Sequence, residues 1–258
     1  MAQISYSRYG DEDKALIIWI HGGGLEGSMW DKQIEYFKEY NNIIVDLPDH
    51  GSSKNMKFTM PSVTELLYAI IEKHKSGKPV YMVGFSLGAQ VIVEYLSLNP
   101  NHIDKAVIIS GHMIQMKTRR KVSKHIAFIG NKLVKFDCFL KKQAKSLYID
   151  EDYYDTFCEN AKSISKKALN RIINENARFE MPESFEDVKT KCLLLYGENE
   201  CKTMIESAKL LKKTAKNIEG FYISNVGHGI SLAKPDLFNR IVKSFFNEEK
   251  YPENIRLI

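Results

Sequence analysis

The chain has 258 residues, of which 44% are hydrophobic, 27% charged and 11% aromatic. These proportions exclude collagen-like, low-complexity and disulfide-scaffold proteins, and they predict a single globular unit. The formal net charge of +5 comes from 37 basic and 32 acidic residues, a surplus too small to indicate a nucleic-acid partner.

The sequence carries no membrane, secretion or metal signal. No apolar stretch approaches the roughly 20 residues that span a bilayer, and the N-terminal segment lacks the pattern of a signal peptide. The four cysteines form no C-x-x-C pair and have no histidine at metal-ligand spacing. We therefore expect a cytoplasmic protein with reduced thiols, no stable membrane insertion, and no metal or organic cofactor. The sequence does not indicate the oligomeric state.

Six short apolar runs recur along the chain, and none of them alternates apolar with polar residues. They cover residues 15–20, 43–47, 80–83, 106–109, 192–196 and 221–223. Unbroken apolar runs indicate strands that are covered on both faces, as in a parallel sheet with helices above and below it. The fold class is therefore predicted as α/β, with a mostly parallel sheet flanked by helices.

Helical patterns lie between these runs. One helix is predicted from Ser62, where Ser62 and Glu65 have capping-box spacing, and a second follows Ser86 and ends at Asn99. The last helix is predicted to begin at Pro235, a residue favoured in the first turn of a helix. These helices alternate with the strands, as expected for β-α-β winding.

The segment 112–187 has no strand-like run, and we expect it to form a helical cap inserted into a core made of residues 1–111 and 188–258. Residues 112–149 carry ten Lys or Arg and one acidic residue, Asp137. These cations are either a solvated helix face or a surface that steers an anionic substrate, such as the thioester of a phosphorylated carrier. A membrane-surface role ranks lower, because the segment shows neither Trp nor a wide apolar face.

The strongest local motif is G-x-S-x-G at residues 84–88, which lies between an apolar run and a helical pattern. This motif places a serine on a sharp strand-to-helix turn, where glycines on either side let neighbouring chain approach. The helix that begins after Ser86 lets the Leu87 amide donate to a developing oxyanion. Ser86 is thus the candidate nucleophile.

A serine nucleophile needs a base and a carboxylate that orients the base. His228 follows the last strand-like run, and Glu200 follows the run 192–196. Both therefore lie at the carboxyl ends of strands, where open parallel sheets bind their ligands. Glu198 remains an alternative to Glu200.

With these residues in view, the chain resembles the α/β-hydrolase-fold serine hydrolases of the cap-bearing esterase type. Residues 21–24 (HGGG) resemble the oxyanion loop of that family, and residues 46–53 (DLPDHGSS) resemble its D-x-x-G-H-G-x-S loop, with Asp49 in place of glycine. The resemblance covers the core but not the cap, which the family fold implies is inserted after the sixth strand.

The resemblance implies a role for each matching residue. Ser86 is the nucleophile, His228 the general base, Glu200 its orienting acid, and the Gly23 and Leu87 amides form the oxyanion hole. The family more often has Asp at the acid position, so Glu200 is a departure by one methylene.

Further residues are expected beside the catalytic ones. Trp30, Phe85 and His112 are expected to contact substrate, although a loop histidine without a role is the simpler interpretation of His112. His21 and His50 are expected to be structural, since the sequence does not supply either of them with a serine and a carboxylate in the way that it supplies His228 with Ser86 and Glu200.

The predicted activity is hydrolysis of a small or medium carboxylic ester or thioester through an acyl-enzyme intermediate. A C–C bond hydrolase, an acyltransferase or a perhydrolase would use the same triad, and a hydrolase-fold ligand-binding protein with little turnover would retain the same fold. The sequence does not separate these alternatives, because they differ in the pocket formed by the cap.

Overall fold

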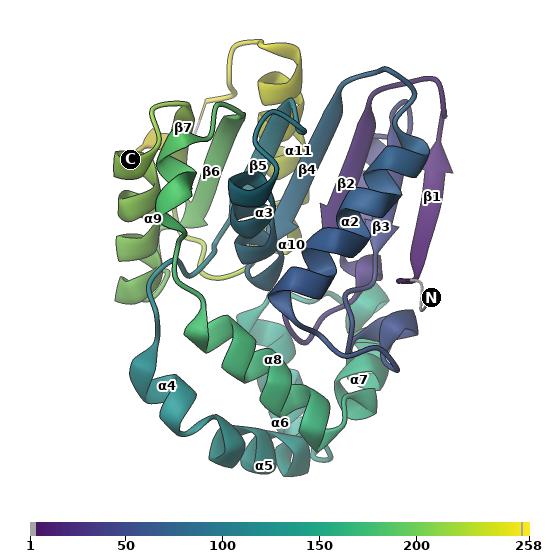
Figure 1. The fold of residues 1–258 in the computed structure, drawn as a ribbon. Helices are drawn as coiled ribbons and strands as arrows, with labels where there is room; N and C mark the ends of the chain where they lie inside the picture. The colour runs from purple at the N-terminus through teal and green to yellow at the C-terminus, as the bar shows by residue number, and fades with distance from the viewer. Residues whose placement is uncertain (1–3, 254) are drawn as a thin grey trace.

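The structure is a computed structural model that describes residues 4–253 and 255–258, and within them a single eight-stranded sheet forms the centre of the molecule (Figure 1). The strand order is β1-β3-β2-β4-β5-β6-β7-β8. Strands β2 to β7 run parallel, and the edge strands β1 and β8 run antiparallel to their neighbours. The strands are β1 (Tyr6–Gly10), β2 (Leu16–Ile20), β3 (Asn41–Val45), β4 (Val80–Phe85), β5 (Lys105–Ile109), β6 (Lys191–Gly197), β7 (Ile218–Ile223) and β8 (Arg256–Leu257).

The six predicted strands are confirmed as β2 to β7. Nearly all of their residues are buried. Alternate side chains along β2 enter two separate cores: Ile18 lies in one, and Ile17 and Trp19 lie in the other. This covering of both faces explains the unbroken apolar runs. The edge strands β1 and β8 were not predicted, since they are largely exposed and contain no apolar run.

Helices cover both faces of the sheet. One layer contains α2 (Met60–His74), α3 (Leu87–Leu98) and α9 (Lys202–Thr214), and the other contains α1 (Asp31–Tyr36), α10 (Ile230–Ala233) and α11 (Pro235–Asn247) (Figure 1). Helix α11 begins at Pro235 as predicted. Helix α2 begins two residues earlier than predicted, because Thr59, and not Ser62, caps it by accepting a hydrogen bond from the Ser62 amide.

Five helices between β5 and β6 form a separate layer beyond the carboxyl ends of the strands (Figure 1), and we call them the cap. They are α4 (Lys117–Lys121), α5 (Ser123–Leu133), α6 (Asp137–Ser146), α7 (Glu151–Ser163) and α8 (Lys166–Arg178). The cap was expected after the sixth strand, but it follows the fifth strand, β5. The count differs by one because, within the described residues, the single edge strand β1 is the only strand before β2.

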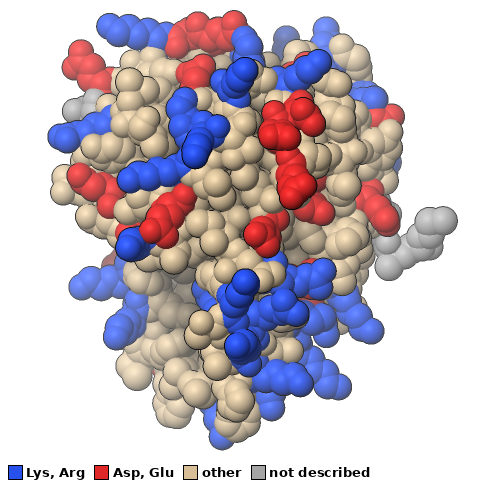
Figure 2. All heavy atoms as spheres, turned by 60° about the vertical axis from the view of Figure 1, so that its left-hand side comes forward, with Lys and Arg blue, Asp and Glu red and all other residues tan. Residues whose placement is uncertain are grey.

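The cap surface differs in charge from the core surface. Figure 2 shows Lys and Arg side chains gathered over the lower part of the molecule, where the cap lies, and most of the acidic side chains in that view lie above them. Across residues 4–253 and 255–258, no helix has both the length and the apolar content needed to cross a bilayer.

Candidate active site

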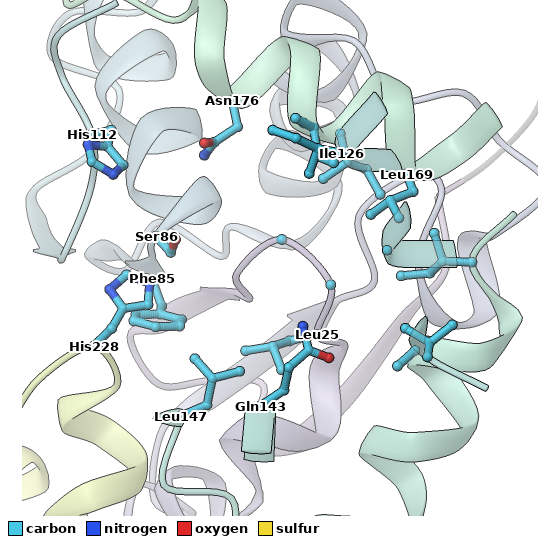
Figure 3. A pocket seen from close by; sticks show the side chains of 18 of the residues that line it. Leu25, Phe85, Ser86, His112, Ile126, Gln143, Leu147, Leu169, Asn176 and His228 are labelled. Atoms are coloured by element: carbon cyan, nitrogen blue, oxygen red, sulfur yellow. The ribbon is translucent and has the colours of Figure 1, made fainter. Parts of the chain in front are cut away.

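A cavity of about 610 Å³ lies between the cap and the carboxyl ends of the parallel strands. The core contributes the loops that follow β2, β4, β5, β6 and β7, and the cap contributes the opposite wall. Ser86, His228 and Glu200 line this cavity together with Gly23, Phe85 and His112. Figure 3 labels Ser86, Phe85, His112 and His228 among them. The cavity therefore brings together residues that lie more than 200 positions apart in the chain.

Ser86 occupies a strained turn between β4 and α3, with φ of 54° and ψ of −106°. Both flanking glycines are required by close packing. A Cβ atom on Gly84 would lie 2.5 Å from the carbonyl oxygen of Gly88, and one on Gly88 would lie 2.4 Å from the carbonyl oxygen of Ile20. The G-x-S-x-G spacing thus lets the chain turn sharply enough to expose the Ser86 hydroxyl to the cavity.

Two backbone amides near Ser86 are free of the usual helical and loop partners. Leu87 is the first residue of α3, so its amide has no acceptor within the helix. In the loop after β2, the Gly24 amide donates to Nε2 of His50 at 3.0 Å. Gly23 lines the cavity, and its amide has no hydrogen-bond acceptor within the described residues.

His228 and Glu200 are in direct contact, with 2.9 Å between Nδ1 of the ring and Oε1 of the carboxylate. The Glu200 side chain is 4% exposed and the His228 side chain 29% exposed. A buried carboxylate at Nδ1 favours the tautomer that carries its proton on Nδ1, which leaves Nε2 as a proton acceptor. This arrangement produces a base on the cavity wall.

The ring of His228 also packs against Phe85, the residue before Ser86, with 4.7 Å between ring centroids. Figure 3 shows this ring and Ser86 on the same side of the cavity. No hydrogen bond joins the Ser86 hydroxyl to His228 among the described residues, and such catalytic bonds are often formed only once substrate is bound.

The competing carboxylate, Glu198, points elsewhere. Its Oε2 accepts a hydrogen bond from the Asn225 amide at 3.0 Å, and the residue is exposed at the surface. Of the two candidates left open by the sequence, Glu200 is the one that contacts His228.

His21 and His50 stabilise the two loops beside the cavity, as expected from the sequence. His21 accepts a hydrogen bond from the Leu47 amide, and Nδ1 of His50 contacts the Pro48 carbonyl at 2.9 Å. Burial lowers the pKa of both rings, and that of His50 falls to about 3. Both histidines are therefore neutral at physiological pH and hold the chain in place.

His112 lines the cavity, and its Nδ1 atom is buried without a hydrogen-bond partner among the described residues. Burial lowers its pKa, and the nearby Arg119 and His228 lower it further. The ring of His112 thus forms part of the cavity wall and favours the neutral form.

The expected contact between Trp30 and substrate is wrong. Trp30 ends a short 3₁₀ helix, η1 (Gly27–Trp30), that turns the indole inward, where it is completely buried. The ring packs against Trp19 and Phe238, with centroid distances of 5.2 and 6.2 Å. It does not line the cavity, so its role is in the core.

The cap residues of the site were missed by sequence reasoning. Helix α8 places Leu169, Ile172 and Asn176 in the cavity wall, and the Ile172 methyl lies 3.3 Å from the position of a Cβ on Gly23. The i, i+3 and i+7 spacing of these residues was visible in the sequence, but the side of the helix that faces Ser86 depends on how the cap docks.

Helix α8 is held in place by a partly buried ion pair. Arg171 donates from Nε to Oδ2 of Asp49 at 2.8 Å and from Nη2 to Oδ1, and the Asp49 side chain is 1% exposed. Asp49 has a φ of +67°, which explains why the similar family loop has glycine there. The unusual aspartate thus acquires a function that glycine cannot have: it binds the cap.

Across the described ranges, no group of three or more His, Cys, Asp or Glu side chains is placed to hold a metal ion. The expected absence of a cofactor stays a prediction.

Comparison with known proteins finds a family model that matches part of the chain, and several relatives. A family model described as the alpha/beta hydrolase fold matches residues 15–124. The uncharacterized hydrolase YugF of Bacillus subtilis is 23% identical, over 94% of this chain and 93% of its own. A monoacylglycerol lipase of Mus musculus is 20% identical, over 95% of this chain and 79% of its own. In a solved structure, the bromoperoxidase of Bacillus anthracis aligns over 95% of each chain with a TM-score of 0.82 and 20% identity.

Proposed function

We propose that the chain is a serine hydrolase of the α/β-hydrolase superfamily, and that it cleaves a small or medium carboxylic ester or thioester. The hydrogen bond between Glu200 and His228, in the same cavity as Ser86, supports this proposal most directly. A surface histidine without a catalytic task needs neither a buried carboxylate nor a strained serine turn nearby.

The reaction has two halves. Ser86 Oγ attacks the carbonyl carbon while His228 Nε2 takes its proton, and the Gly23 and Leu87 amides stabilise the negative oxygen of the tetrahedral intermediate. The protonated His228 then gives this proton to the leaving alcohol or thiol, which leaves an acyl group on Ser86. A water molecule, deprotonated by His228, attacks that acyl group, and the carboxylic acid departs as Ser86 regains its proton.

The cavity favours an acyl chain as the part of the substrate held by the cap. Side chains that the cap contributes are mainly aliphatic or aromatic, among them Phe157, Ile164, Leu169, Ile172 and Ile173. Burying an alkyl chain against such a wall contributes about 0.8 kcal/mol per methylene. A cytoplasmic location is part of this proposal, and the four free cysteines of the described residues are consistent with it.

The test uses p-nitrophenyl esters and acyl-coenzyme A thioesters of increasing chain length. Ser86→Ala is expected to lower kcat by about 10⁶, because no other group forms the acyl-enzyme. Labelling by a fluorophosphonate probe should occur in the native chain and be absent in Ser86→Ala. A correctly folded native chain that takes up no probe and cleaves none of these substrates would favour a ligand-binding protein instead.

The same triad transfers an acyl group to acceptors other than water. C–C bond hydrolysis, acyl transfer and perhydrolysis therefore stay as alternatives within the superfamily, separated by which product forms when an alcohol, peroxide or diketone is supplied. The bromoperoxidase with the same fold makes hydrogen peroxide a worthwhile acceptor to include.

A further inference from the structure

Exposed apolar side chains concentrate on one part of the cap. Of the twelve large hydrophobic residues that are exposed within the described chain, six lie between residues 114 and 136. They are Ile114, Val122, Ile126, Phe128, Ile129 and Phe136. Val122, the residue before α5, and Ile129 are seven positions apart and so share one side of this helix. Single exposed apolar residues are ordinary, but a group of this kind marks an interaction surface.

The same segment is strongly basic. Residues 117–136 contain seven cations and no acidic residue. The cations are Lys117, Arg119, Arg120, Lys121, Lys124, Lys132 and Lys135, and all are exposed. None of them forms an ion pair with the rest of the described chain, whose salt bridges involve other residues. Figure 2 shows cations gathered over this part of the molecule. We call the exposed side chains of residues 114–136 that lie outside the cavity the α4–α5 face.

Cations and apolar side chains are interleaved on this face. The ammonium groups of Lys132 and Lys166 lie 4.3 and 4.5 Å from the centre of the Phe128 ring. An exposed aromatic ring between two lysines presents apolar surface and positive charge to the same partner.

The opposite side of α5 faces the cavity. Ala127 is buried under the helix, and Gly130 approaches the Leu169 side chain of α8, which would lie 3.3 Å from a Cβ atom on that glycine. Ile126, Gly130 and Asn131 line the cavity. One helix therefore separates the α4–α5 face from the space next to Ser86.

We propose that the α4–α5 face docks on an anionic lipid surface, with Ile129 and Phe136 entering the headgroup region and the surrounding cations contacting lipid phosphates. Basic residues alternating with Phe and Ile on a short helical surface are the combination that binds such interfaces. A nucleic-acid backbone would also attract the cations but would gain nothing from burying isoleucines. The sequence did not reveal these exposed apolar side chains, because identifying them requires knowing which side of α5 faces solvent.

The proposal is tested by flotation of the full-length Ser86→Ala chain with vesicles, so that no lipid is cleaved during the measurement. We expect binding to phosphatidylcholine vesicles that contain phosphatidylglycerol, and weak binding to phosphatidylcholine alone. The double variant Ile129→Ser/Phe136→Ser should bind at least about tenfold more weakly, because both apolar anchors are lost. Lys121→Gln and Lys124→Gln should each weaken binding by about fivefold.

Two matched controls come from the core. Leu98 is as exposed as Phe136, at 58%, and Lys202 is 89% exposed at its side chain. Leu98→Ser and Lys202→Gln should leave vesicle binding unchanged, and circular dichroism should show all variants folded. Equal loss in the cap and core variants would overturn the proposal, as would binding of a DNA duplex but not of vesicles. Because the Ser86→Ala chain is used, the result does not depend on whether the native chain hydrolyses esters.

Discussion

Replacement of Glu200 by glutamine tests the site most sharply, because it removes one charge and almost no volume. Oε1 of Glu200 lies 2.9 Å from Nδ1 of His228, and the side chain is 4% exposed, so water cannot replace the carboxylate. The neutral amide of Glu200→Gln fits the same space but no longer stabilises the imidazolium that forms when Ser86 loses its proton.

The size of the effect follows from two contributions. A hydrogen bond to a charged group contributes about 1.5–3 kcal/mol, or about 10- to 150-fold in rate. The glutamine amide can also donate to Nδ1, which moves the ring proton to Nε2 and leaves no acceptor for the serine proton. In a serine protease the corresponding change lowers kcat by about 10⁴. We therefore expect kcat to fall by about 10³ to 10⁴, with KM nearly unchanged.

The assay is steady-state hydrolysis of the best p-nitrophenyl ester, with Glu198→Gln as the matched control. Glu198 is exposed, and within the described residues its side chain accepts a hydrogen bond only from the Asn225 amide, so its substitution should change kcat by less than about threefold. Nearly native activity in Glu200→Gln, or a large loss confined to Glu198→Gln, would refute the assignment of Glu200 as the orienting acid.

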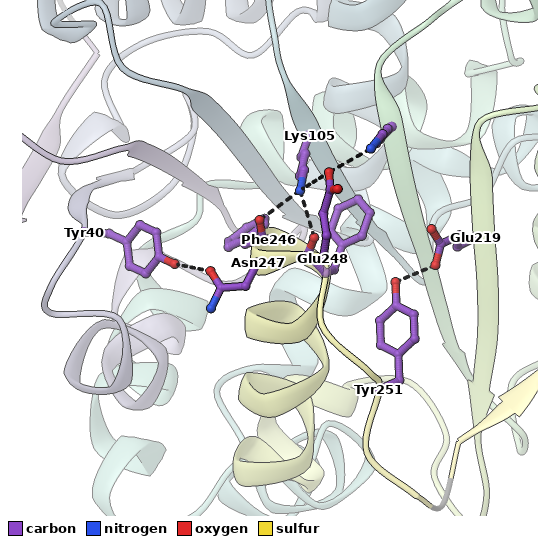
Figure 4. Close-up of polar contacts among 9 residues, drawn as sticks. Tyr40, Lys105, Glu219, Phe246, Asn247, Glu248 and Tyr251 are labelled. Carbon is purple, nitrogen blue, oxygen red and sulfur yellow. Dashed lines mark hydrogen bonds and ion pairs between the residues drawn. The ribbon is translucent and has the colours of Figure 1, made fainter.

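Three further predictions concern stability. Arg171→Met leaves the Asp49 carboxylate buried without its cation, and should lower the free energy of unfolding in urea by about 3 kcal/mol. Adding Asp49→Gly should restore most of this loss, because no charge then stays buried and glycine suits the positive φ of position 49. A further loss of stability in the double variant would contradict this prediction. His50 has a pKa of about 3 in the folded chain against 6.5 unperturbed, so the unfolded chain takes up the proton first as the pH falls. Stability should therefore fall by about 1.4 kcal/mol per pH unit between these values from this group alone, and His50→Gln should flatten the slope; parallel slopes would count against it. Lys105 donates hydrogen bonds to two backbone carbonyls at the end of α11 (Figure 4). Lys105→Met should therefore lower the free energy of unfolding by about 2 kcal/mol without changing kcat. A loss of activity in the folded variant would disprove a purely structural role.

Much of the core could be predicted because its information is local. The strand before Ser86, the flanking glycines and the helix after it are contiguous, and the steric demand that selects glycine at position 84 comes from Gly88, four residues further on. The demand at position 88 comes instead from the Ile20 carbonyl at the end of β2, and the motif reveals it only because its spacing is recognisable. Trp30 was placed wrongly for the opposite reason: whether an aromatic ring faces a cavity or a core depends on the turn of η1 and on partners as distant as Phe238.

What the sequence by itself determined is the succession of the six parallel strands with helices between them, and the proposed roles of Ser86 and His228, since each of these two residues follows a recognisable strand end. Only the tertiary structure decided which glutamate meets His228, which side chains of the cap close the cavity, and which remain outside as an exposed basic and apolar face. These outcomes depend on the docking of α8 and α5, and contacts such as Arg171 with Asp49 join residues 122 positions apart. Helical periodicity indicates which residues share a side of a helix, but the packing of the whole chain decides which side is buried.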